Sequence, residues 1–294
     1  MRKEPRSVRS ATLIIIVVCL LLGAAIVWGV TSMLAKLTDY GSSTSIGNSE
    51  QDELSDGIDD TIFPDAIESL PLNTYDPNGF YTENGLRKYE SDDMIGIAGI
   101  DVSSYQDSID WQQVKQAGVE FAMIRLGYRG YVSGALDLDD CFLENMEGAL
   151  DAGIPVGVYF FSQALTEEEA VEEAEYVLNW VRGYDITYPI VFDWEEVDAQ
   201  ARTDEMNMLK LTACAVAFCE TIEEAGFTPA VYFNQAYGYQ QLNLPSLKDY
   251  VFWLAAYEET PTFHFDFQMW QYTSQGTVPG IQGPVDLNIY FKKK

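Results

Sequence analysis

The sequence predicts an α/β fold: a (β/α)8-like TIM barrel with reduced outer helices, preceded by one transmembrane helix. Three observations predict it. Short apolar runs alternate with helical patterns, polar residues follow those runs, and one long uncharged segment lies near the N-terminus. A doubly wound open sheet is the main alternative, but no glycine-rich phosphate loop follows the first apolar run.

The N-terminal region has the pattern of a membrane anchor. Residues 1–10 are basic, and residues 11–35 carry no charge. At a rise of about 1.5 Å per residue, a helix over 11–35 would cross the roughly 30 Å hydrocarbon core of a bilayer. We therefore expect a single-pass protein of the cell membrane, with a cytoplasmic N-terminus and an extracellular main domain. Secretion after cleavage of a signal peptide is the alternative.

The rest of the chain divides by composition. Residues 36–94 are polar and acidic at first and then irregular, which predicts a flexible linker and a lead-in. Residues 95–294 carry the alternating pattern and are predicted to be the catalytic barrel domain.

Charge and cysteine content exclude several classes of protein. The net charge of -29 opposes nucleic-acid binding, because little would neutralise phosphates. The four cysteines have no metal-like spacing, and His264 is the only histidine. We expect no metal and no cofactor, so carboxylates must carry any catalysis.

The strands and helices are predicted from periodicity. Segments 139–152, 166–182 and 204–225 have helical spacing, with Thr166 and Thr203 as candidate N-caps. Connections in the last third are short and rich in glycine and proline, which predicts fewer helices there. Eight nearly continuous apolar runs predict strands buried on both faces, at 97–102, 119–125, 154–161, 188–193, 229–233, 251–256, 267–272 and 285–290.

The run PIVFDWEEV, residues 189–197, ends in three acids. Side chains alternate along a strand, so Asp193 and Glu195 share one face while Trp194 and Glu196 take the other. In a parallel barrel the carboxyl ends of the strands form one rim, where catalytic groups lie. Asp193 and Glu195 are thus predicted at that rim, and Glu196 points away from it.

Other polar and aromatic residues end the remaining runs. Clustered acids of differing pKa suit glycoside hydrolysis, in which one carboxyl group keeps its proton and another stays charged. Alternatively, the same acids could bind a divalent cation, or they could be ordinary solvated strand ends. The residues predicted at the rim besides Asp193 and Glu195 are Asp101, Arg125, Tyr159, Phe161, Tyr232, Asn234, Tyr257, Trp270, Tyr272 and Asp286.

The domain from Gly96 to Phe291 resembles the glycoside hydrolase family 25 lysozymes, the Chalaropsis-type N-acetylmuramidases. The resemblance covers about two-thirds of the chain. The matching motifs, in family order, are GIDVSSYQDSIDW, IRLGYRGY, GVYFFSQALTEEEAVEEA, PIVFDWE, VYFN, WLAAY and MWQYTSQGTVPGIQGPVDLN.

The resemblance implies a peptidoglycan hydrolase that cleaves the β-1,4 bond between N-acetylmuramic acid and N-acetylglucosamine. Glu195 would be the general acid and Asp193 its partner carboxylate, acting either as nucleophile or as an aid to the substrate's acetamido group. Asp101 and Asp286 would be the other active-site acids. Phe160 departs from the family, in which a histidine often follows the tyrosine of the third strand.

The expected partners are peptidoglycan glycan strands and, through the N-terminal helix, a membrane. A wall-binding module without turnover is the alternative of a different class, and a metal-dependent hydrolase is a third possibility. The residues expected to bind substrate are Arg125, Tyr159, Tyr232, Asn234, Tyr257, Trp270 and Tyr272.

Overall fold

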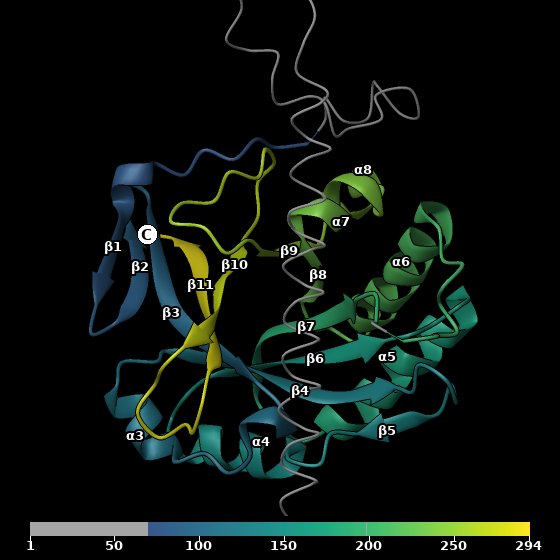
Figure 1. Ribbon diagram of the computed structural model, residues 1–294, viewed down its shortest axis with the longest axis horizontal. Helices are drawn as coiled ribbons and strands as arrows, with labels where there is room; N and C mark the ends of the chain where they lie inside the picture. Colours follow the sequence, from purple (N-terminus) through teal and green to yellow (C-terminus); the bar gives the residue numbers. More distant parts are fainter. Residues whose placement is uncertain (1–69, 198) are drawn as a thin grey trace, which may run out of the picture. The chain divides into compact units, whose positions relative to one another are not determined.

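The computed structural model describes residues 70–197 and 199–294, whose strands form one sheet closed into a barrel (Figure 1). The barrel has eight strands in the order β3, β4, β6, β7, β8, β9, β10 and β11. The elements are η1 (Pro77–Gly79), β1 (Phe80–Glu83), β2 (Leu86–Glu90), β3 (Met94–Val102), η2 (Ser104–Gln106), α3 (Trp111–Gln116), β4 (Phe121–Arg129), β5 (Leu136–Leu138), α4 (Phe142–Asp151), β6 (Val156–Ser162), α5 (Glu167–Val181), β7 (Ile186–Trp194), α6 (Met208–Glu224), β8 (Pro229–Asn234), α7 (Gln235–Gln240), α8 (Leu244–Leu247), β9 (Val251–Ala255), β10 (Met269–Gly276) and β11 (Val285–Lys293).

The predicted (β/α)8 TIM barrel is wrong, because the last strand runs against its neighbours. Strands β3 to β10 of the barrel are parallel, but β11 pairs antiparallel with both β10 and β3. A parallel crossover needs roughly a dozen or more residues, usually including a helix. The segment 277–284 between β10 and β11 is too short for that, so β11 returns as a hairpin.

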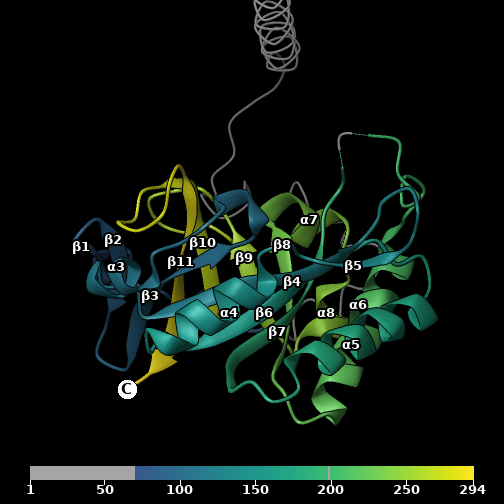
Figure 2. The same cartoon turned by 90° about the horizontal axis from the view of Figure 1, so that it is seen from below.

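Helices are also fewer than a (β/α)8 barrel requires. Within the described residues, the connections 256–268 and 277–284 carry no helix, and only the short α7 and α8 follow β8. The long helices α5 and α6 lie together on the side of the barrel opposite the β1–β2 hairpin (Figures 1 and 2). The structure is therefore an eight-stranded β-barrel with partial helical cover.

The positions of the strands and long helices are nevertheless confirmed. The eight apolar runs became β3, β4 and β6 to β11, and the three helical segments became α4, α5 and α6. Thr166 caps α5 as predicted, accepting a hydrogen bond from the Glu169 N–H. The cap predicted at Thr203 is wrong, because α6 begins later and Asn207 caps it.

The barrel interior is filled by aromatic and aliphatic side chains below its mouth. The ring of Phe121 stacks on Tyr188 with centroids 4.6 Å apart. Gly99 allows this position, because a Cβ there would lie 2.3 Å from the Phe121 ring. The side chains buried together with Phe121 in this cluster are Met123, Tyr188, Val191, Ala230, Trp253 and Met269.

The segment 70–90 packs against the barrel, which the sequence patterns did not predict. Strands β1 and β2 form a hairpin, and β2 pairs with β3. Tyr75 stacks on Phe291 with ring centroids 4.0 Å apart, and Leu72 forms an isolated bridge with Phe265. The sheet therefore continues beyond the barrel on the side of β3.

The predicted anchor 11–35, together with the tail 1–10 and residues 36–69, lies outside the described residues. Within the described part of the chain, no helix is both long and apolar enough to cross a membrane. The prediction of a single-pass membrane protein, including a membrane partner, therefore gains no support and is corrected.

The packed interior leads to a stability prediction. Phe121→Ala should lower the free energy of unfolding by about 3–5 kcal/mol, because the buried ring leaves a cavity among side chains that cannot collapse fully. Chemical denaturation followed by circular dichroism measures this. Leu209→Ala, at a helix residue with 66% exposure, is the control and should change the free energy by about 0.5 kcal/mol or less. Equal effects of the two substitutions would contradict the proposed packing.

Candidate active site

A cavity of about 680 Å³ opens at the mouth of the barrel, where the parallel strands end. Four acids line it. Asp101 and Asp193 are the second-to-last residues of β3 and β7. Glu195 follows β7 directly, and Asp286 is the second residue of β11. Because β11 is antiparallel, its first residues reach the same mouth as the last residues of its neighbours. Asp286 is the register partner of Asp101, so these two acids lie on adjacent strands.

The alternation predicted for the end of β7 is confirmed. Asp193 and Glu195 line the cavity, whereas Trp194 packs against Tyr237 with ring centroids 5.7 Å apart. The Tyr237 hydroxyl lies 3.5 Å from Glu196, which is exposed. Asp193 is only 4% exposed, and its Oδ1 accepts no hydrogen bond from the described residues. That oxygen is free to interact with a bound group.

Asp101 is held by two amides that sequence reasoning missed. Its Oδ2 accepts hydrogen bonds from Gln271 Nε2 at 2.9 Å and from Asn288 Nδ2 at 2.7 Å. Gln271 Oε1 in turn accepts from the hydroxyls of Tyr232, at 3.1 Å, and Tyr257, at 3.0 Å. The sequence offered one sign of these amides, a polar residue within an apolar run: Gln271 in MWQY and Asn288 in VDLN.

The pKa of each of the four predicted acids is raised, which favours protonation. Burial is the main cause of the raised pKa of each carboxyl, and it raises the pKa of Asp286 to about 6. After burial, the charge of Asp286 raises the pKa of Asp101 and of Glu195, and the charge of Glu195 raises the pKa of Asp193. Like charges this close oppose full ionisation, so the group retains protons well above the usual carboxyl range.

Arg125, which is expected to bind substrate, lies on the cavity wall and pairs with an acid. Its guanidinium forms an ion pair with the buried Asp139, with Nη2 to Oδ2 at 2.7 Å, and Nη2 also donates to Ser104 Oγ at 3.1 Å. It lines the cavity and lies over the ring of Tyr105 at 5.0 Å and that of Tyr128 at 5.9 Å. Arg125 is thus a fixed cation on the cavity wall.

The aromatic wall is only partly the predicted one. Tyr159, Tyr232 and Tyr257 line the cavity, as does Phe161. Phe160, the residue that departs from the family pattern, packs instead toward Tyr176 of α5, with ring centroids 6.0 Å apart. Cavity residues that sequence reasoning did not select are Ser103, Ser104, Tyr105, Gln106, Tyr128, Arg129, Tyr131, Asp140, Val197, Trp253 and Gln271.

Three residues expected to bind substrate lie elsewhere in the described part of the chain. Asn234 caps α7 by accepting a hydrogen bond from the Tyr237 N–H at 2.9 Å. Trp270 is fully buried, and its Nε1 donates to the Ala256 carbonyl at 2.8 Å. The hydroxyl of Tyr272 accepts a hydrogen bond from the Arg87 N–H at 3.0 Å. All three have structural contacts away from the cavity.

A second group of contacts fixes the segment that carries Glu195. The Glu195 carbonyl accepts a hydrogen bond from Gln163 Nε2 at 3.2 Å, and Gln163 Oε1 accepts one from the Thr203 hydroxyl at 2.7 Å. Arg202, the residue before Thr203, donates from Nη2 to Glu169 Oε1 of α5 at 2.5 Å. The chain after β7 is therefore held at Glu195 and again at Arg202 and Thr203.

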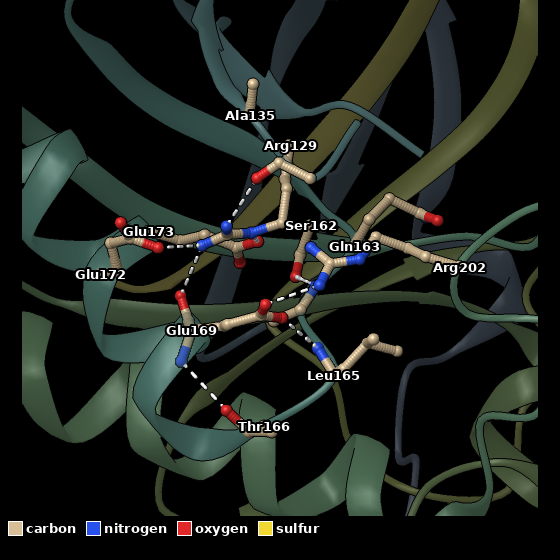
Figure 3. Close-up of polar contacts among 12 residues, drawn as sticks. Arg129, Ala135, Ser162, Gln163, Leu165, Thr166, Glu169, Glu172, Glu173 and Arg202 are labelled. Carbon is tan, nitrogen blue, oxygen red and sulfur yellow. Dashed lines mark hydrogen bonds and ion pairs between the residues drawn. The ribbon is translucent and has the colours of Figure 1, made fainter. Parts of the chain in front are cut away.

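Behind these contacts lies an ion network centred on the buried Arg129 (Figure 3). Arg129, 3% exposed, donates from Nε to Glu173 Oε1 at 2.7 Å and from Nη2 to Glu172 Oε2 at 2.8 Å. It also donates to the Gly134 and Glu169 carbonyls at 2.8 and 2.9 Å. Burial raises the pKa of Glu173 to about 7 despite its bonds to Arg129 and Ser162. The network joins β4 to α5 beside the cavity.

Comparison with known proteins identifies the chain. Residues 100–281 match the glycosyl hydrolases family 25. The chain belongs to this family. Lysozyme M1 of Streptomyces globisporus is 30% identical over 211 residues, which cover 67% of this chain and 69% of the relative. The autolytic lysozyme of Clostridium acetobutylicum is 27% identical over 195 residues, which cover 66% of this chain and 56% of the relative.

A solved structure agrees with the family 25 assignment. The modular autolysin LytC of Streptococcus pneumoniae, in complex with a synthetic peptidoglycan ligand, is similar with a TM-score of 0.61 at 25% identity. The similarity covers 72% of this chain and 52% of the autolysin. The family resemblance inferred from the motifs is confirmed, and residues 100–281 form a glycoside hydrolase domain of the lysozyme type. Because the chain spans only about half the length of the clostridial lysozyme and the autolysin, the whole protein's activity remains a proposal.

The crowded acids predict a pH-dependent stability. Asp286 has a folded-state pKa of about 6, above its ordinary value of 3.8. A raised pKa stabilises the fold below the unfolded-state value, and this stabilisation is lost as the pH rises through the folded-state value. Asp286→Asn should therefore gain roughly 1–2 kcal/mol over wild type near pH 8, allowing for solvent screening, and this gain should vanish below about pH 4.

Urea denaturation of both proteins across this pH range measures the difference. Asp249→Asn, at an exposed position outside the cavity, is the matched control. A gain for Asp286→Asn that stays constant with pH would contradict the raised pKa.

Proposed function

We propose that this family 25 domain cleaves the β-1,4 bond between N-acetylmuramic acid and N-acetylglucosamine in peptidoglycan. The observation that carries the proposal is the convergence of four carboxyl groups on one aromatic-walled cavity of about 680 Å³. Glycoside hydrolysis requires one protonated and one charged carboxyl group beside the scissile bond. The named lysozymes among the relatives, and the autolysin solved with a peptidoglycan ligand, support this substrate class.

Glu195 is the general acid of the proposed reaction. Burial and then the charge of Asp286 raise its pKa, which favours the protonated form that an acid must hold near neutral pH. Its proton passes to the glycosidic oxygen as the bond to the sugar breaks. The contacts of Gln163 with the Glu195 carbonyl keep this residue in place during that transfer.

Asp193 is the partner carboxylate. It shares the cavity face with Glu195, and its Oδ1 is without a hydrogen bond among the described residues, so it is available to the sugar. As positive charge develops on the sugar, a carboxylate there stabilises it, either by attacking the anomeric carbon or by holding the substrate's acetamido group in position to attack. A water molecule then completes hydrolysis.

Asp101 and Asp286 support these two acids. Two amide donors hold Asp101 in one orientation beside the reacting bond. Asp286 raises the pKa of Glu195 through its charge. The flat faces of Tyr159, Tyr232 and Tyr257 suit the apolar faces of sugar rings, and Arg125 adds a cation to the same wall.

Glu195→Gln should lower kcat/KM by about 10²–10⁴-fold, because the amide cannot deliver a proton. Glu196→Gln is the matched control, since the neighbouring acid is exposed and lies near Tyr237 on the other face. The full chain is incubated with purified peptidoglycan, and released reducing ends are counted. If wild type binds peptidoglycan but releases no reducing ends, the chain is a binding module and the proposed reaction is wrong.

The proposed reaction needs no metal ion, because protonated and charged carboxyl groups supply both steps. Within the described residues, no three or more His, Cys, Asp or Glu side chains are grouped so as to hold a metal ion. Prolonged dialysis against a chelator should therefore leave the release of reducing ends unchanged. Loss of activity that added divalent cations restore would favour a metal-dependent hydrolase instead.

A further inference from the structure

The segment 71–90 lies outside the family match, which begins at residue 100. In Figure 1 the chain leading into the β1–β2 hairpin runs along the connection between β9 and β10, residues 256–268. We propose that this segment braces the cavity wall, with Arg87 as a positioning residue that holds Tyr257 in place to bind the glycan. This inference rests on the proposed function and concerns how the same cavity recognises its substrate.

Arg87 forms hydrogen bonds to the connection 256–268 close to Tyr257. Its Nη1 donates to the Glu258 carbonyl at 2.9 Å and also to the Glu259 carbonyl. Its backbone N–H donates to the hydroxyl of Tyr272, and its guanidinium lies over the rings of Trp270 and Tyr272, at 5.6 and 5.5 Å. A guanidinium placed over two rings has little freedom, so the two carbonyls have a fixed donor.

Asn73 fixes the far end of the same connection. Its Nδ2 donates to the Phe263 carbonyl at 2.9 Å and to the Pro261 carbonyl at 3.3 Å. Its backbone N–H donates to the His264 carbonyl at 2.9 Å. Both ends of the connection are thus hydrogen-bonded to the segment 71–90, although that segment is far away in sequence.

Tyr257 links the braced connection to the cavity, because it lies on that connection and lines the cavity. It precedes Glu258 and Glu259, the two residues whose carbonyls Arg87 binds, and its ring is 58% exposed while lining the cavity. Its hydroxyl donates to Gln271 at 3.0 Å, and Gln271 donates to Asp101. An exposed ring that is anchored through its hydroxyl alone takes its position mainly from its backbone. Moving that backbone would move the platform offered to a sugar.

Arg87 reaches carbonyl groups and rings, whereas the acids have their own contacts on the strands. Its loss should therefore weaken substrate binding and leave the chemical step intact. Arg87→Ala in the full chain should raise the KM for soluble peptidoglycan fragments about fivefold, with kcat within about twofold. Arg87→Lys, which can still donate to one carbonyl, should recover part of the loss.

Lys88→Ala is the matched control on the same strand. Lys88 pairs instead with Glu83 and Glu120, at 3.2 and 3.1 Å, and its loss should leave KM unchanged. Tyr257→Ala supplies the decisive comparison, because coupled residues are not additive in a double-mutant cycle. If Arg87 acts through Tyr257, adding Arg87→Ala to Tyr257→Ala should raise KM no further.

An unchanged KM for Arg87→Ala, or a full additional rise on top of Tyr257→Ala, overturns the inference. Should Arg87→Ala fail to fold, Asn73→Ala tests the other end of the brace and should raise KM in the same way; no rise there also overturns it. Sedimentation of each variant with insoluble peptidoglycan, in the Glu195→Gln background, reports binding without turnover. Weakened binding supports the brace even where wild type releases no reducing ends, an outcome that would refute only the proposed reaction.

Discussion

The antiparallel pairing of β11 with β3 is the constraint on which the rest of the structure depends. It closes the barrel without a final crossover helix, and it reverses the direction in which the last strand presents its side chains. In a fully parallel barrel the first residues of the last strand would lie at the opposite end from the catalytic mouth. Here Asp286 stands at the start of β11 and yet faces Asp101 at the end of β3. The strand pairing that closes the barrel therefore also completes the acid cluster.

Placing these four acids at one end of the barrel costs electrostatic free energy, and the surrounding residues offset part of that cost. Two amides, Gln271 and Asn288, stabilise charge on Asp101, whereas Asp193 has one oxygen without a donor among the described residues. The two carboxyl groups therefore lie in different environments, and in the proposed reaction that oxygen of Asp193 is left to the substrate. Burial and the neighbouring charges raise the pKa of Asp101, Asp193 and Glu195, which favours proton retention over full ionisation. Stability is given up at the position where chemistry is proposed.

Features that depend on local sequence pattern, such as strand positions, were predicted correctly. Features that depend on contacts with distant residues, such as strand direction, were not. Apolar runs located all eight barrel strands, and alternation separated Asp193 and Glu195 from Glu196. Apolar runs carry no direction, so the reversal of β11 could not be seen from them; only the short connection before it was a hint. Alternation also implies that Gln271 opposes Trp270 and Tyr272, but it cannot say which face is inside. The aromatic pair was expected in the cavity, and the amide lies there instead.

The acids proposed for catalysis and the tyrosine proposed for substrate binding lie on different kinds of backbone. Asp101, Asp193 and Asp286 lie on barrel strands. Asp101 and Asp193 have register partners on both neighbouring strands, and Asp286 is paired with Asp101. Tyr257 lies on a connection without such pairing, and connections open and shift more readily than strands. The Tyr257 hydroxyl is bonded to Gln271 of β10, but the backbone that carries the ring is held from outside the barrel. The carbonyls beside Tyr257 accept their hydrogen bonds from Arg87, a residue that precedes the family match. The acids can therefore remain in position while the substrate-facing wall is adjusted by changes in the flanking segment.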